Sequence, residues 1–261
     1  FTKWIRIETV KPNRLKINFN FDSDILRAGR NYRAALSSRW LRGTPSSGMK
    51  AKVTANFRDI PTTFRSYDDY VFDAPFGENY YPETDVLEGR LDDSGEATVN
   101  FSFTPNSEVN NMLHATFITR VFEPGGDFSI NRFTKKISPF DSYVGFKVPW
   151  SDHRWQKMNT GEDHSFDVIT LDEQGKPLAS KEITVKIYKL EWRYWWSSSY
   201  ENLASYAGRT YHEPVYTTRV NTGRDGTGSF QVNIPKSRWG RYLVLADLPG
   251  GNTAGRGVYF D

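Results

Sequence analysis

Residues 171–177 read LDEQGKP and contain the Glu-Gln pair that ends a C-x-E-Q tetrapeptide. In such a tetrapeptide the cysteine and the glutamine close an internal thioester, which acylates nearby nucleophiles. Leu171 occupies the position of the cysteine, and the whole sequence contains no cysteine. A thioester, a disulfide, a zinc-thiolate site and a thiol nucleophile are therefore all excluded within these 261 residues.

Metal-ligand spacing is also missing from the sequence. The four histidines are not spaced four residues apart, and H-E-x-x-H is absent (His114, His153, His164 and His212). The segments LDDSGE and GRDGTG combine acids with glycine, but they lack the alternating ligands and the distal glutamate of a calcium loop. Both segments are typical of hairpin turns, so we expect no metal and no cofactor.

Carboxylate pairs offer little for hydrolysis. Asp68–Asp69 and Asp92–Asp93 are adjacent, so on a strand their side chains point to opposite faces and cannot converge on one bond. The G-x-S-x-G elbow, the phosphate-binding loop and the dinucleotide fingerprint are absent. The sequence predicts no catalytic residue and a chain that is not an enzyme. A hydrolase would require a Ser/His/Asp or carboxylate cluster that only the fold could assemble.

A dense group of aromatic residues is the most conspicuous chemistry left: Trp192, Tyr194, Trp195, Trp196 and Tyr200. Flat aromatic rings can stack on sugars or anchor a protein interface. They can equally fill a core or cover a sheet edge. Strand alternation places Trp192, Tyr194 and Trp196 on one face and Trp195 on the other, so Trp195 is the candidate for exposure.

The elements that would position these residues are strands. Apolar and polar residues alternate with a period of two in five separate runs, which indicates half-buried antiparallel strands with one face on a core. Glycine, proline, asparagine and aspartate stand between the runs, where turns require them. The runs are 15–21, 51–57, 99–103, 183–187 and 230–234.

The sequence also repeats itself. Four anchors recur in the same order, between 125 and 132 residues apart: Gly29 with Gly161, Gly43 with Gly175, Ser94 with Asp225, and Pro124 with Pro249. Two tandem antiparallel β-sandwiches of seven strands each, immunoglobulin- or fibronectin-III-like, are therefore predicted. We expect a leading strand or linker over 1–10, a first sandwich over 11–139 and a second over 140–261.

Each copy carries an insertion between its G-x-P strand and its D-x-G hairpin. The insertions are Arg58–Glu88 and Leu190–Tyr216, and both are long, aromatic and partly polar. Loops of this length in a compact domain are usually functional, or they pack over an open edge of the sandwich.

The charge and the hydropathy of the sequence limit the kinds of partner that we expect. The 34 basic and 31 acidic residues are evenly spread and give a net charge of +3, so nucleic acid is not expected as a partner. No apolar run approaches the ~20 residues of a membrane span. The sequence starts at Phe1 without a methionine or a signal peptide, and we expect it to be part of a longer chain.

Particular phrases then resemble a known family. PNRLKI, SSRWLRGTPSSGMKAKV, YDDYVFDAP and DDSGEATVNF in the first copy, with EWRYWW, DGTGSFQVNIP and WGRYLVLADLPGG in the second, are similar to bacterial alpha-2-macroglobulins. The resemblance covers nearly the whole chain and implies two consecutive macroglobulin domains upstream of that family's thioester domain. No catalytic residue of the family matches a position here.

The resemblance implies a non-catalytic scaffold within a larger endopeptidase inhibitor, or protease trap. The implied partners are neighbouring domains of the parent chain and, through the parent, proteases. The implied location is the bacterial periplasm or cell envelope, with lipid anchoring of the parent an open matter. The alternative from the residues alone is a carbohydrate-binding or adhesin-type sandwich that uses the exposed part of the Trp192–Tyr200 cluster.

Overall fold

The computed structural model describes residues 12–75, 81–105, 109–190 and 213–261. The chain forms two compact units that do not follow the sequence order simply. The first unit consists of Phe1–Phe57, Tyr81–Phe103 and His114–Lys136, and the second of Arg58–Tyr80, Thr104–Leu113 and Ile137–Asp261. Two segments from within the first repeat are therefore part of the second unit.

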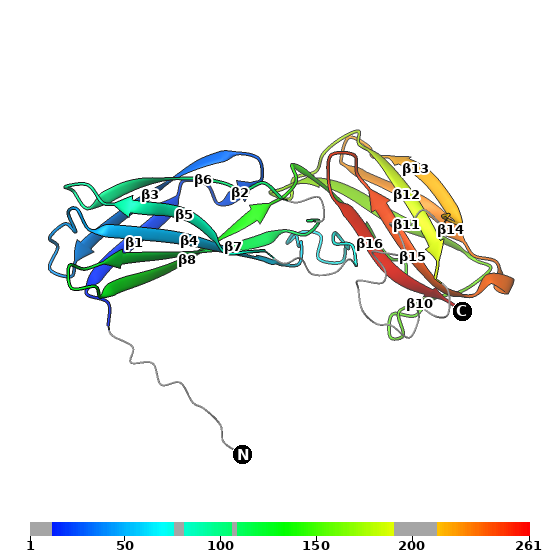
Figure 1. The fold of residues 1–261 in the computed structure, drawn as a ribbon. Helices are drawn as coiled ribbons and strands as arrows, with labels where there is room; N and C mark the ends of the chain where they lie inside the picture. Colours follow the sequence, from blue (N-terminus) through cyan, green and yellow to red (C-terminus); the bar gives the residue numbers. More distant parts are fainter. Residues whose placement is uncertain (1–11, 76–80, 106–108, 191–212) are drawn as a thin grey trace, which may run out of the picture. The chain divides into compact units, whose positions relative to one another are not determined.

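The first unit contains a three-stranded sheet in the order β1-β3-β6 and a five-stranded sheet in the order β2-β8-β7-β4-β5 (Figure 1). Its strands are β1 (Leu15–Phe21), β2 (Ile25–Arg27), β3 (Asn31–Trp40), β4 (Lys50–Asp59), β5 (Thr84–Arg90), β6 (Glu96–Ser102), β7 (Leu113–Phe122) and β8 (Phe128–Ser138). β5 pairs antiparallel with β4, so the last part of the first predicted insertion is a strand and not a loop.

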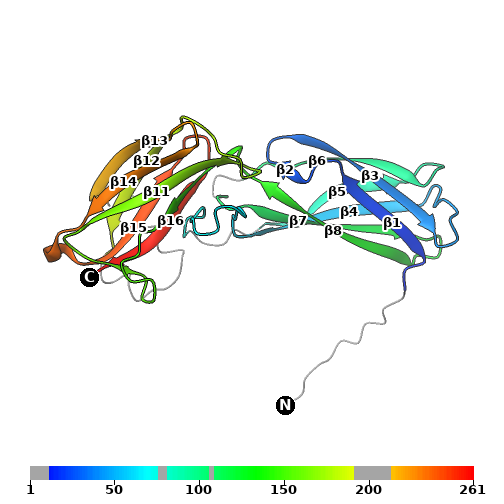
Figure 2. The ribbon, with the colours of Figure 1, turned by 180° about the vertical axis from the view of Figure 1, so that it is seen from behind.

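The second unit repeats this plan with sheets β14-β11-β9 and β10-β16-β15-β12-β13 (Figure 2). A short 3₁₀ turn, η1 (Lys236–Arg238), precedes β15. The strands are β9 (Ser142–Lys147), β10 (Lys157–Met158), β11 (Asp163–Asp172), β12 (Glu182–Lys189), β13 (Tyr216–Asn221), β14 (Thr227–Asn233), β15 (Gly240–Asp247) and β16 (Thr253–Phe260).

The strand order of the second unit is that of the first with eight added to every number, which confirms the internal repeat. In the described ranges, each unit has the seven longer strands that the sequence predicted. Among the described residues each also has one short strand, β2 with three residues and β10 with two. The predicted fold class, two tandem all-β sandwiches of the immunoglobulin-like type, is confirmed. The short β10 pairs parallel with β16, which is an exception to the antiparallel plan.

Each core lies between the two sheets of its unit. In the first unit the ring of Phe117 lies 5.1 Å from that of Phe21 and 5.0 Å from that of Phe101. In the second, Phe166 stacks on Phe230 at 4.9 Å. These rings are all contributed by the inward positions of alternating strands, and aromatic pairs at such distances add to the stabilisation that burial gives.

No helix in the described parts of the chain is both long enough and apolar enough to cross a membrane.

Candidate functional site

Within the part of the chain that the structure describes, the residues that the sequence singled out do not come together as a site. Trp192, Tyr194, Trp195, Trp196 and Tyr200 lie outside the residues that the structure describes. Leu171 is buried near the end of β11, and the following residues form a turn in which Gly175 N–H donates to Asp172 O at 3.0 Å. In the described ranges, three or more acidic or histidine side chains nowhere gather in a way that could hold a metal ion.

The feature that sets the second unit apart is the outer face of its three-stranded sheet. At four outward positions the second unit has Tyr143, Gly145, Ile169 and Leu171, and all four are buried. The strand registers align these positions with the first unit's Lys16, Asn18, Ser37 and Arg39, which are polar and exposed or half-buried. The same sheet face is thus polar in one copy and apolar in the other. An apolar outer face requires a cover.

The cover is the segment 58–75, which we call the strap and which is cyan in Figure 1. Its Phe64 and Phe72 form a cluster with Tyr143, Ile169 and Leu171. The ring of Phe64 lies 4.8 Å from that of Phe72 and 5.6 Å from that of Tyr143, both in edge-on geometry. Burying rings of this size removes roughly 150–250 Å² each from water. The strap is therefore part of a second, smaller core on the outside of the sheet.

Backbone pairing fixes the strap along the edge strand β9. The N–H of Val71 donates to Phe146 O at 2.8 Å, and the N–H of Phe146 donates to Val71 O at 3.1 Å. On the other sheet, the N–H of Gly255 in β16 donates to Asp73 O at 2.9 Å. The strap thus forms a single antiparallel β-bridge with the open edge of β9, which satisfies backbone groups that an uncovered edge leaves to solvent.

A buried amide ties the strap to both sheets. The Oδ1 of Asn252 accepts the N–H of Val144 at 2.6 Å, and its Nδ2 donates to Phe72 O at 2.6 Å and to Val144 O at 3.1 Å. Asn252 is 1% exposed, so the loss of these bonds would leave buried polar groups unpaired. Nearby, Asn110 makes a reciprocal pair of bonds with the backbone of Thr253, at 2.8 and 2.9 Å.

Two glycines make room for the aromatic rings. A Cβ on Gly145 would lie 2.7 Å from Cδ1 and Cζ of Phe72, so only glycine lets the ring lie against β9. A Cβ on Gly175 would lie 2.9 Å from Cδ1 of Phe64. The LDEQG turn therefore has a packing role: its glycine is covered by a strap ring.

The strap contains two carboxylates in different environments, Asp69 at the surface and Asp73 in the interior. Asp69 forms an exposed ion pair with Lys147 at 2.5 Å. Asp73 Oδ2 accepts the N–H of Thr62 at 2.9 Å, whereas its Oδ1 is buried and has no hydrogen-bond partner among the described residues. Burial raises the pKa of Asp73, and the bonds from Thr62 only partly offset this.

The hydroxyl of Tyr143 is a buried, hydrogen-bonded group of the cluster. It shares a 2.6 Å hydrogen bond with Ser138 Oγ, and burial raises the pKa of Tyr143 far above its usual range. The phenol therefore stays protonated at neutral pH and acts as a structural group.

The sequence predicts that the first insertion is functional or packs over an open edge, but this prediction does not identify the face that the strap covers. The two repeats contain a difference that points to this face. Outward positions that are polar in the first copy become Tyr143, Ile169 and Leu171 in the second, and β11 has a run of four buried residues, 168–171.

Comparisons with known proteins place the chain in a family. Residues 13–139 match the family model of the bacterial alpha-2-macroglobulin MG5 domain, and residues 149–261 match that of bacterial macroglobulin domain 6. The chain is 22% identical to an alpha-2-macroglobulin of Rickettsia conorii, over 92% of this chain and 12% of that protein. It is 21% identical to the alpha-2-macroglobulin of Escherichia coli K12, over 93% of this chain and 15% of that protein.

Solved structures show the same fold. The trypsin-activated alpha-2-macroglobulin of Escherichia coli superposes with a TM-score of 0.63 and 17% identity, over 95% of this chain and 17% of that one. The native conformation of the Escherichia coli protein gives a TM-score of 0.61, and the match covers 97% of this chain and 16% of that one. The chain thus spans less than a fifth of the length of these relatives. It belongs to the bacterial alpha-2-macroglobulin family and consists of consecutive macroglobulin domains.

Proposed function

We propose that the chain is a non-catalytic scaffold of an alpha-2-macroglobulin-like endopeptidase inhibitor, located in the periplasm or cell envelope. We further propose that the macroglobulin domains divide at 139/140, with 1–10 as a leading strand or linker. The relatives named above are whole alpha-2-macroglobulins, of which this chain matches a short part. The parent is thus proposed to trap proteases, and this chain to hold its working parts in place.

The observation that carries the scaffold role is the strap. The chain leaves the first unit after Phe57, contributes the strap to the second, and returns at Tyr81. The first repeat therefore supplies structure that the second unit needs to cover its outer face. A tandem array built in this way is suited to transmit a displacement along the chain, because the strap cannot shift without disturbing a packed cluster.

A trypsin assay tests the proposal. The full-length gene product is expected to slow the hydrolysis of a large protein such as casein by trypsin, while the 261-residue chain alone, which contains no cysteine, is expected to have no effect. A full-length variant carrying Phe72→Ala should inhibit less than the wild type, and Trp239→Ala, at an exposed position outside the strap, should behave as wild type.

Two results would contradict the proposal. One is inhibition of trypsin by the 261-residue chain alone at equimolar amounts. The other is a full-length product that leaves casein hydrolysis unchanged across a range of molar ratios.

A further inference from the structure

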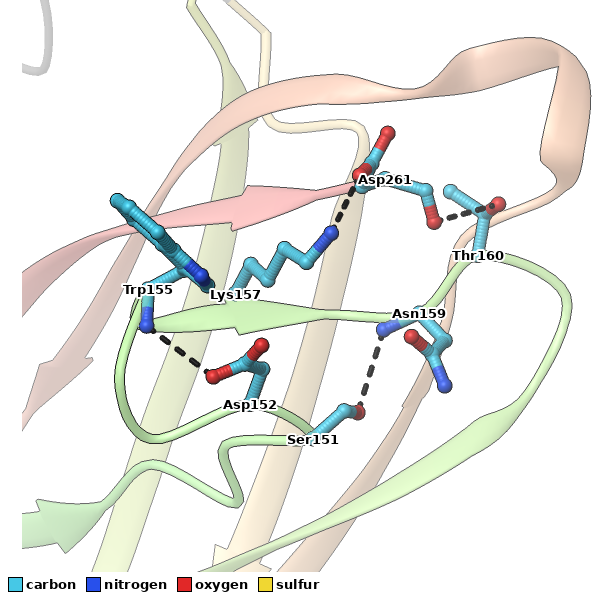
Figure 3. Close-up of polar contacts among 7 residues, drawn as sticks. All are labelled: Ser151, Asp152, Trp155, Lys157, Asn159, Thr160 and Asp261. Atoms are coloured by element: carbon cyan, nitrogen blue, oxygen red, sulfur yellow. Dashed lines mark hydrogen bonds and ion pairs between the residues drawn. The ribbon is translucent and has the colours of Figure 1, made fainter.

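An exposed tryptophan on the second unit stands on a turn that is held firmly by hydrogen bonds. Trp155 is 69% exposed. The N–H groups of Ser151 and Asp152 donate to Lys157 O at 3.0 and 3.1 Å, and the N–H of Lys157 donates back to Asp152 O at 3.2 Å. The carboxylate of Asp152 accepts the N–H of Arg154 at 2.9 Å. It also accepts the N–H of Trp155 at 3.2 Å (Figure 3). Residues 151–158, which we call the Trp155 turn, therefore hold this side chain in place without covering it.

Asp261 is attached to the base of the Trp155 turn. Its carboxylate accepts a bond from Lys157 Nζ at 2.7 Å (Figure 3). Its carbonyl accepts the N–H of Thr160 at 2.9 Å, and its own N–H donates to Met158 O at 2.9 Å. Polypeptide that continues past Asp261 in a longer chain therefore starts beside the turn.

The side chains around Trp155 suit a protein partner. The guanidinium of Arg154 lies 5.5 Å from the Trp155 ring centroid, within cation–π range. Tryptophan and arginine are the residue types that most often carry binding energy at interfaces. Because the turn is already ordered, docking would cost little conformational entropy.

The small area of the Trp155 turn favours a partner segment in the same chain over a separate protein. A stable complex between separate proteins buries roughly 1,200–2,000 Å² in total, which is far more than one eight-residue turn presents. A segment of the same chain has an effective concentration on the order of millimolar, so one anchor is enough to hold it. The matched relatives are much longer than this chain, which covers 12% and 15% of them.

We propose that the Trp155 turn is the docking surface for the part of the longer chain that directly follows Asp261. The proposal rests on the proposed function in one respect, that the chain belongs to a longer macroglobulin. The following segment is expected to cover the Trp155 indole, with Arg154 at the rim of the contact.

Hydroxyl-radical footprinting read by mass spectrometry tests this. In the full-length product, oxidation of Trp155 is expected to be at least about fivefold slower than in the 261-residue chain, as for an anchor that leaves water. Trp239, 55% exposed in the same unit, is the internal reference. Equal oxidation of Trp155 in the two proteins, or slower oxidation of Trp239 alone, would overturn the proposal.

A variant provides the second readout. In the full-length product, Trp155→Ala should speed proteolytic cleavage in the segment after Asp261 several-fold, and Trp155→Phe should restore most of the resistance. Cleavage that is unchanged in Trp155→Ala would refute the docking. A product that protects Trp155 but does not inhibit trypsin would contradict the proposed function and leave the docking supported, so the two failures are distinguishable.

Discussion

At the scale of single residues, Gly145 is the position where the strap is most sensitive to change. The ring of Phe72 occupies the space that a Cβ would take. Gly145→Ala is expected to push this ring out and to lower the free energy of unfolding of the second unit by about 1–3 kcal/mol, as overpacking does. Chemical denaturation followed by fluorescence measures the difference.

Gly257→Ala is the matched control for Gly145→Ala. Gly257 also lies in a strand of the second unit, but a Cβ there meets nothing within 4 Å. Its replacement should change stability by no more than about 0.5 kcal/mol. Equal losses in the two variants would mean that the loss at Gly145 comes from the backbone and not from the strap.

Asp73 gives the strap a pH dependence of known sign. Burial raises its folded pKa above the ordinary value of 3.8, so the folded state binds the proton more tightly than the unfolded state. The stability that this proton contributes is fully present below pH 3.8 and is lost as the pH rises through the folded pKa.

Asp73→Asn should remove this loss. The amide oxygen can still accept the N–H of Thr62, and no buried charge remains, so the variant should be more stable than the wild type at pH 7 by about 1 kcal/mol. Thermal unfolding of both proteins between pH 4 and about 7 measures this difference in stability. Asp68→Asn, at an exposed strap position, should leave the pH profile unchanged. If both variants follow the wild-type profile, Asp73 is not the source.

At the scale of elements, the two copies use the same turn with different residues. Gly48 has a φ of +66°, and Ser180, which stands 132 positions later, has a φ of +54°. A residue with a side chain loses roughly 1–2 kcal/mol of folded-state stability in this left-handed region. Glycine avoids this strain, but it loses more conformational entropy on folding, so the net gain from glycine is smaller. Ser180→Gly is expected to raise the melting temperature of the second unit, corresponding to about 0.5–1 kcal/mol.

The reciprocal change tests whether the turns are equivalent. Gly48→Ser should destabilise the first unit by a similar amount, seen in calorimetry as a shift of its transition alone. A neutral effect at both positions would show that the strain at Ser180 is offset by local hydrogen bonds.

The strands could be predicted because alternation is typical of a half-buried sheet. The repeat could be found because two of its anchors, Gly29 with Gly161 and Gly43 with Gly175, keep glycine at positive φ in both copies. The strap could not be placed in the same way. Its residues 60–75 follow neither period, and their partners on β9 and β16 are more than 70 positions away in the sequence. Only tertiary packing selects the face that they cover. The aromatic cluster around Trp195 lies outside the described residues, so its role stays a prediction.

At the scale of the whole molecule, the second repeat should not be self-sufficient. A fragment 140–261 lacks the strap, so Tyr143, Ile169 and Leu171 would face water. This fragment is expected to bind the dye ANS and to aggregate, whereas fragment 1–261 should do neither. A fragment 140–261 that is monomeric and as stable as the same residues within the 261-residue chain would show that the strap is dispensable.

Amide hydrogen exchange tests the central claim, that the strap is part of the second unit, most directly. The N–H groups of Val71 and Phe146 each donate to the other residue's carbonyl, so both lose their partner if the strap leaves. In the 261-residue chain both amides are predicted to exchange at the same slow rate, at least about a thousandfold below that of an unstructured peptide. Exchange of Val71 and Phe146 at unstructured rates, while the β11–β14 ladder stays protected, would contradict the account.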